Sequence, residues 1–369
     1  MVNKKTECEA ARKMKKTLTD RQQQILALVI RDFIETGAPV GSTRLVKRYE
    51  LEVSPATVRN ELSSLSDDGF LVQQHTSAGR MPTEFGYRYF VQRLIGEFEL
   101  PIDERQMIRH QFHQARLDLD QWMRLAAAVL AHTSLGASIV TAPQPTTNRF
   151  KHVQLISTQG RLVLMILVFY GGHVKQQMLS LTEPVAQNQL TSVTESLNKQ
   201  FDNFSYDEIN SRQSQLEDAL ERDVTRLILD GLWRADRRRI SDIYRDGLAN
   251  IIEDEGTRQA VKVLEEGPFL ASVLNDTLEP DVNGVQVVIG GEGRWEELKE
   301  CTMILSRYGE FDQLYGAVAV VGPTRMPYGR NISAVRYVAD IMSGFVNDYY
   351  LEDSSSEGMN DPALDEAMS

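Results

Sequence analysis

The chain has 369 residues, 42% of them hydrophobic and 25% charged, with a formal net charge of −12 at pH 7. This length predicts two or three domains, the composition is that of an ordinary globular protein, and two widely separated cysteines indicate a cytoplasmic protein without a disulfide framework. The longest apolar run, LVLMILVF at 162–169, is well short of the roughly 20 residues that a membrane helix needs, so a membrane protein is excluded.

Charge is distributed unevenly along the chain. Residues 1–95 carry 15 Lys and Arg against 11 Asp and Glu, whereas the remaining residues carry 25 against 41. Such asymmetry indicates a basic binding module on an acidic body, and the acidic body would confine contact with DNA to one end of the chain. The lysine-rich start is predicted to be a basic, flexible arm at 1–17.

Two helices are predicted within residues 18–50. The first begins after Thr19, because Thr19 with Gln22 three residues later is a capping box, and Gly37 stands where such a helix would end. A short second helix begins at Ser42. Both helices contribute an apolar face to one small core.

The third predicted helix has two very different faces. Ser54 is a suitable N-cap and Pro55 suits the first helical position, so the helix runs from there to Gly69. Its apolar residues at i, i+4 and i+7 form a core stripe: Val58, Leu62 and Leu65. The far side carries small or hydrogen-bonding residues and one arginine: Ala56, Thr57, Arg59, Asn60 and Ser63. A face without bulky side chains suits close approach to a DNA groove.

A strand and a loop follow this helix. FLVQQH at 70–75 predicts a strand, TSAG at 76–79 predicts a loop tip, and 80–94 predicts a return followed by a helix. Three short helices, then a strand and a loop, are typical of a winged helix-turn-helix domain. We therefore predict a winged-helix DNA-binding domain at 18–95.

The residue types in this domain predict how it would contact DNA. In the major groove Asn can pair bidentately with adenine and Arg with guanine. Contacts to bases are predicted for Ala56, Thr57, Arg59, Asn60 and Ser63. Contacts to the DNA backbone, from basic side chains, helix starts and the wing, are predicted for Ser42, Arg44, Lys47, Arg48, Ser54, His75, Thr76, Ser77 and Arg80.

The rest of the chain predicts an α+β body. A helical segment and a meander of strand-like runs are followed by a mostly helical, highly charged stretch, after which strands return near residue 285. Strands that are interrupted and then resumed indicate one α+β domain in two segments, 103–206 and 281–350, with an insertion at 207–280. The acidic, serine-rich end at 351–369 is predicted to be disordered.

Nothing in the sequence predicts catalysis or metal binding. His110 and His113 are three residues apart on a helix but lack a third ligand. The glycine-rich stretches IGGEGRW at 289–295 and GPTRMPYGRN at 322–331 lack the Gly-Lys-Ser/Thr of a phosphate loop. Cys301 begins an apolar strand and is predicted to be a core residue. We expect no enzyme activity, no cofactor and no metal.

Three motifs carry a family resemblance. VRNELSSL at 58–65, HTSAGRMPT at 75–83 and YGAVAVVGPTRMPYGRNISAVRYVADIM at 315–342 resemble the heat-inducible transcription repressor HrcA family. The resemblance implies a winged-helix domain, a GAF-like domain and an inserted dimerisation domain. It also implies a homodimer that represses chaperone operons by binding an inverted repeat of double-stranded DNA, the CIRCE operator, and that the GroE chaperonin keeps active. Gly293 stands where the family usually carries Asn, so no role is inferred for its loop.

Two other functions stay open at this point. A GAF-like domain would suit a small-molecule-gated transcription regulator, which ligand-dependent operator affinity would support. A winged-helix protein-interaction module would instead lack salt-sensitive DNA binding.

Overall fold

The computed structural model describes residues 18–357, with gaps at 75–78, 97, 116–117, 146, 171–173, 238–241, 253–260, 262–263, 279–283 and 311–313. The chain divides into two compact units. The first lies within residues 1–141, 243–308 and 317–345, and the second within 142–242, 309–316 and 346–369. The predicted basic arm at 1–17 lies outside the described residues.

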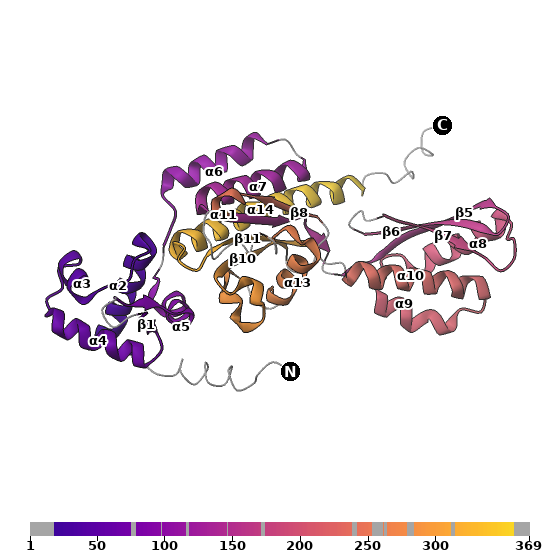
Figure 1. The fold of residues 1–369 in the computed structure, drawn as a ribbon. Coiled ribbons are helices and arrows are strands. Elements are labelled where there is room, and N and C mark those ends of the chain that lie inside the picture. The colour runs from indigo at the N-terminus through magenta and orange to yellow at the C-terminus, as the bar shows by residue number, and fades with distance from the viewer. Residues whose placement is uncertain are drawn as a thin grey trace. The chain divides into compact units, whose positions relative to one another are not determined.

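The first unit begins with a small helical region (Figure 1). Its elements are α2 Asp20–Thr36, α3 Ser42–Arg48, α4 Pro55–Asp67, β1 Leu71–Val72, β2 Met81–Pro82, α5 Glu84–Tyr89 and the π-helix η1 Phe90–Leu94. The predicted capping box is confirmed, because Thr19 and Gln22 bond to each other's backbone amides. Gly37 ends α2 in the left-handed conformation with φ 66°. Local sequence signals therefore set the ends of this helix.

A short β-ribbon follows α4, which ends at Asp67, two residues before the predicted end. The strand predicted at 70–75 is formed only at Leu71–Val72, which pairs antiparallel with Met81–Pro82. Phe70 is fully buried. Its ring centroid lies 4.7 Å from that of Phe85, in a tilted arrangement, and 5.2 Å from that of Tyr89, in an edge-to-face arrangement. These rings fix the ribbon to α5.

A larger antiparallel sheet forms the rest of the first unit. Its strand order is β8-β3-β11-β10-β9. The short strand β4 pairs with the start of β11, and both of these segments are residues of the second unit. Helix α7 packs on β3 and β8. It also packs against α14, because the ring centroid of Trp122 in α7 lies 4.6 Å from that of Phe345 in α14. The strands are β3 Ala137–Thr141, β4 Gln144–Pro145, β8 Ile243–Asp246, β9 Gln286–Ile289, β10 Cys301–Glu310 and β11 Leu314–Pro323. The helices are α6 Ile102–Gln114, α7 Leu119–Ser134, α11 Ala249–Ile252, α13 Gly267–Thr277, η4 Gly290–Gly293, η5 Glu296–Leu298 and α14 Tyr328–Glu357.

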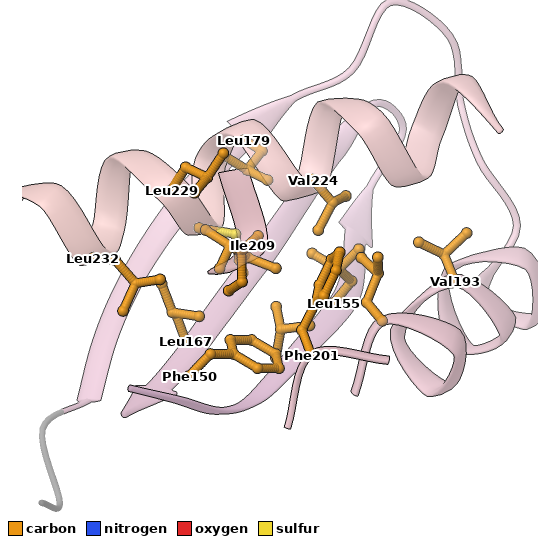
Figure 2. Close-up of a cluster of buried hydrophobic side chains, with 14 of the residues drawn as sticks. Phe150, Leu155, Leu167, Leu179, Val193, Phe201, Ile209, Val224, Leu229 and Leu232 are labelled. Carbon is orange, nitrogen blue, oxygen red and sulfur yellow. The ribbon is translucent and has the colours of Figure 1, made fainter. Parts of the chain in front are cut away.

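The second unit is a three-stranded sheet covered on one face by helices. The predicted meander is confirmed as β5 Phe150–Gln159, β6 Leu162–Phe169 and β7 Val174–Ser180, all antiparallel. The helices are α8 Gln187–Phe201, α9 Tyr206–Arg212, η2 Gln213–Gln215 and α10 Ala219–Arg237. Alternate residues of the strands, such as Leu155 and Leu167, point to the helices and meet Phe201 and Leu229 in one core (Figure 2).

The limits of the second unit differ from those of the predicted insertion at 207–280. The meander and α8 share one apolar core with α9 and α10, so the unit begins near residue 142. Residues 243–246 form β8, which pairs with β3 and so belongs to the first unit. Packing partners, which no local pattern reveals, move both boundaries of the insertion toward the N-terminus.

The C-terminal helix also departs from prediction. Helix α14 extends to Glu357, which places residues 351–357 in a helix although the sequence predicts disorder from 351. Residues 358–369 lie outside the described part of the chain. Among the helices that the structure describes, none is both long and apolar enough to span a bilayer. The mixture of helices and antiparallel sheets agrees with the predicted α+β class.

Candidate nucleic-acid interface

Helix α4 separates a buried stripe from an exposed one. Ser54 caps the helix, its Oγ accepting a hydrogen bond of 3.1 Å from the backbone N–H of Thr57, and Pro55 occupies the first turn. Val58, Leu62 and Leu65 are all buried, as their spacing predicts. Burial of these three side chains anchors α4 on the core, each contributing roughly 1.5–3 kcal/mol.

The opposite stripe of α4 is accessible. Ala56, Arg59 and Asn60 are exposed, whereas Thr57 and Ser63 are partly buried. Residues 56, 59 and 60 follow the i, i+3, i+4 spacing of one helix face, so their side chains lie together. Of the five residues predicted to contact bases, the structure therefore places these three on one accessible strip.

After the loop tip, residues 79–80 run beside residues 38–41, which join α2 to α3. Arg80 exchanges two backbone hydrogen bonds with Val40, of 2.8 and 2.9 Å. A Cβ on Gly79 would lie 2.7 Å from backbone atoms of Pro39 and Val40, so only glycine fits there. The Arg80 guanidinium reaches α4, with Nη2 3.5 Å from Ser63 Oγ. Arg80 is thus held beside the exposed strip.

Two of the arginines predicted to contact phosphate have partners inside the protein. Arg44 Nε lies 2.9 Å from Asp32 Oδ2, and Arg48 Nη1 lies 2.7 Å from Asp32 Oδ1. Arg48 also pairs with Glu35. Because these two carboxylates offset both positive charges, Arg44 and Arg48 offer little net charge to a phosphate.

The remaining predicted backbone contacts divide into three groups. Lys47, in the last turn of α3, and Ser54 are exposed. Ser42 is largely buried, with 9% of its surface exposed, so the structure does not support its predicted contact to DNA. The wing residues His75, Thr76 and Ser77 lie outside the described residues.

Asp32 is the residue that sequence reasoning missed. It is fully buried and joins α2 to α3 through the two arginines. It continues the stripe of Ile25 and Val29 at i+7 and i+3, so an acidic residue on an apolar helix face was the available signal. A buried carboxylate of this kind needs a cationic partner.

The histidine, the cysteine and the arginine considered outside the N-terminal region all have surroundings that explain them structurally. Within the described residues no group of three or more His, Cys, Asp or Glu could hold a metal ion. His113 packs its ring edge against Phe345, and Cys301 is buried, as predicted for a core residue. Arg330 Nη2 pairs with Glu104 at 2.7 Å and its Nε donates to the Thr133 carbonyl at 3.0 Å.

These features define an α+β protein in which a helical N-terminal region with an accessible Arg/Asn strip precedes a sheet and a separate second unit. A solved structure described as a hypothetical protein shares the fold, with a TM-score of 0.56 and 22% identity, over 90% of this chain and 98% of that one. The family model of the HrcA protein C-terminal domain matches residues 120–332. The chain belongs to the HrcA family.

Proteins of known name agree with this assignment. The heat-inducible transcription repressor HrcA of Roseiflexus castenholzii is 41% identical over 346 residues, which cover 90% of this chain and 96% of the relative. The protein of the same name from Herpetosiphon aurantiacus is 40% identical over 348 residues, with 91% and 97% covered. The similarity therefore extends over both compact units.

Proposed function

We propose that the chain is a sequence-specific DNA-binding repressor of heat-shock (chaperone) operons. The observation that carries this proposal is the accessible strip of Ala56, Arg59 and Asn60 on an otherwise anchored helix. The relatives named heat-inducible transcription repressors support it independently. Residues 18–95 act as a winged helix-turn-helix domain in which α4 is the recognition helix.

The charge distribution along α4 supports insertion of its N-terminal half into the major groove. Arg59 and Asn60 are the residue types that read guanine and adenine edges bidentately. Asp67 and Asp68 lie at the other end of the helix, where they stay clear of phosphates. Lys47 and Arg80 then contact the flanking backbone.

A homodimer is the second part of the proposal. The β5–β6–β7 sheet turns one face to its helices, and residues of large apolar type on the other face are exposed: Val174 57%, Met178 55%, Leu162 41% and Ile156 38%. Cross-strand pairs such as Leu164 with Met178 and Ile156 with Leu164 make this face continuous. An apolar sheet face of this kind supports association with a second copy of the chain.

Dimerisation would match the symmetry of the target. One recognition helix reads only a half-site, whereas a two-fold dimer presents two helices to an inverted repeat of the CIRCE type. The second unit thus acts as the dimerisation domain, and the larger sheet as a GAF-like domain. Maintenance of the active form by the GroE chaperonin, and a cytoplasmic location, rest on family membership.

The deciding experiment measures affinity of the full chain for a CIRCE-type duplex and for a scrambled duplex over a range of salt concentrations. Specific binding should exceed scrambled binding by about a thousandfold or more, and both should weaken as salt rises. Equal affinity for the two duplexes would overturn sequence-specific repression. Operator binding that recovers fully after heating without chaperonin would refute the GroE part alone.

A further inference from the structure

Within the first unit, the helical region packs against one end of the larger sheet. The Tyr87 ring of α5 lies 5.7 Å from the Tyr328 ring at the start of α14, and the two side chains are 3% and 1% exposed. Tyr328 is fixed in turn, because its hydroxyl donates to the Thr324 carbonyl at 2.7 Å and lies 3.1 Å from Thr302 Oγ1. Tyr87 therefore meets a rigid partner.

A second contact joins the end of α2 to the turn after β11. A Cβ on Gly37 would lie 2.8 Å from Arg325 Nη1, so the guanidinium rests on the C-cap of α2. Helix α2 has no basic residue in its own last turn. The carbonyls at a helix C-terminus carry a partial negative charge that favours a cation. Arg325 supplies this cation from a distant part of the sequence.

A third contact explains the glycine-rich loop at 290–293. Gly290 has φ +63°, and a Cβ there would lie 2.4 Å from Cδ of Glu84 and 2.6–2.7 Å from its carboxylate oxygens. Glu84 is the first residue of α5, close along the helix to Tyr87. The loop is thus a seat without side-chain bulk for an acidic side chain of the helical region.

The segment that joins the helical region to α6 runs along α14. The Ser333 hydroxyl donates to the carbonyl of Phe98, and the Tyr337 hydroxyl donates to the carbonyl of Arg105 at 2.9 Å. A Cβ on Gly329 would lie 3.2 Å from Cβ of Phe98, so the connector lies tight against the helix. The chain between α5 and α6 is therefore held at several points.

The contact region between the helical region and the larger sheet, called the seam from here on, is nevertheless incompletely packed. An open hollow of about 320 Å³ remains in it, lined by Phe33, Pro82, Glu84, Tyr87, Lys299, Glu300, Pro323, Thr324 and Arg325. The Tyr87 hydroxyl is buried without a hydrogen-bond partner. A few defined contacts around a hollow hold an orientation without fusing two parts into one core.

We propose that Arg325, Tyr328 and Gly290 are positioning residues for DNA recognition. They contact no DNA, but they fix the direction of α4 relative to the sheet and thereby help to set the half-site spacing that a dimer accepts. This inference rests on the proposed DNA-binding function. It predicts that loosening the seam relaxes spacing discrimination while leaving the reading of one half-site intact.

The test uses Arg325→Ala in the full chain, because Arg325 is exposed and its removal leaves the core intact. Arg336→Ala, which removes an exposed arginine of α14 outside the seam, is the matched control. Affinities are measured for an inverted repeat with its natural spacer, for one lengthened by about two base pairs, which turns the half-sites by roughly 70°, and for a single half-site.

Wild type and Arg336→Ala should lose about a hundredfold in affinity on the lengthened repeat, since only one helix can then engage. Arg325→Ala should discriminate far less between the two spacers and should bind the single half-site as wild type does. Unchanged spacer discrimination in Arg325→Ala, or none in wild type, would overturn the positioning role.

Hydrogen exchange of the free protein separates this failure from failure of the proposed function. Arg325→Ala should speed amide exchange at the end of α2 and in α5, while exchange in β5–β7 stays unchanged. If wild type binds no inverted repeat, the DNA-binding proposal fails, and exchange still decides whether Arg325 holds the seam. Unaltered exchange in Arg325→Ala would refute the contact itself.

Discussion

Helix α4 in the first unit and the β5–β6–β7 sheet in the second each bury one face and expose the other, but their exposed faces differ in kind. The strip on α4 carries Ala56, Arg59 and Asn60, whereas the open sheet face carries Val174 and Met178. Small and hydrogen-bonding groups suit a polar groove, and large apolar groups suit a second apolar surface. The exposed face, more than the buried one, therefore distinguishes the two proposed partners, DNA and a second copy of the chain.

The largest effect is expected on the apolar side of this comparison. Met178→Lys places a charge on the open sheet face, and a two-fold interface would bury it twice. We expect dimer association to weaken by about 3 kcal/mol or more. Sedimentation over a concentration series measures this. Gln189→Lys, on the exposed side of α8, is the control and should leave the dimer unchanged.

The next largest effect is expected from a change in packing within the helical region that contains α4. A Cβ on Gly86 would lie 2.2 Å from the Phe70 carbonyl oxygen, so Gly86→Ala forces the ribbon away from α5. The expected loss in the free energy of unfolding of the helical region is about 2–3 kcal/mol. Gly344→Ala is the control, because nothing lies within 4 Å of its Cβ position in α14. Thermal unfolding should show Gly344→Ala equal to or more stable than wild type.

The polar face is tested by two substitutions with different signatures. Asn60→Ala should cost about 1–3 kcal/mol per half-site and relax preference at one base pair. Lys47→Ala should weaken all sequences alike and lower the salt slope by roughly one per half-site. Affinities for operator and scrambled duplexes against salt measure both. An unchanged operator-to-scrambled ratio in Asn60→Ala would show that α4 does not read the sequence.

The smallest effect concerns the seam and pH. Partial burial raises the pKa of the Glu84 carboxyl above its ordinary 4.5, against the opposing effects of Arg88 and Lys299 and with a contribution from Glu296. A raised pKa means that the Glu84 carboxyl binds its proton more tightly when the seam is closed, with the helical region packed on the larger sheet, than when these contacts are open. Closure is therefore most favourable below the ordinary pKa and weakens as pH rises through the raised value.

Glu84→Gln should remove this dependence and slow amide exchange in α5 at neutral pH. The measurement is exchange in α5, corrected for its intrinsic pH dependence, from below to above the ordinary pKa of 4.5. Exchange in β5–β7 serves as the internal reference. A pH dependence that persists in Glu84→Gln would assign the titration to another group.

Sequence reasoning succeeded where the determining contacts are local. Thr19 with Gln22, and Ser54 with Pro55, act within one helical turn, so their patterns located the starts of α2 and α4. The turn signal Gln159-Gly160 between two strand-like runs likewise predicted the hairpin of β5 and β6. The stripe of Val58, Leu62 and Leu65 gave the orientation of α4 for the same reason.

It failed where a residue's role depends on a partner far along the chain. Nothing in the sequence near Arg44 and Arg48 indicates that Asp32 pairs with both of their guanidinium groups. The need for glycine at position 290 cannot be predicted from the sequence, because the side chain that packs against it, Glu84, lies about two hundred positions earlier. The insertion boundary failed likewise, since pairing of β8 with β3 is not encoded near either strand.

The pairing of β3 with β8 also brings the two ends of residues 142–242 together. Thr141 and Ile243 are register partners in the β3–β8 ladder, and the next residues continue it, with Ala142 N–H bonded to the Asp242 carbonyl at 3.0 Å. The chain thus leaves and re-enters the first unit through neighbouring residues. A two-residue hairpin turn would bridge this gap. Apart from the short strand β4, which pairs with β11, residues 142–242 are therefore an insertion between two adjacent strands of the larger sheet.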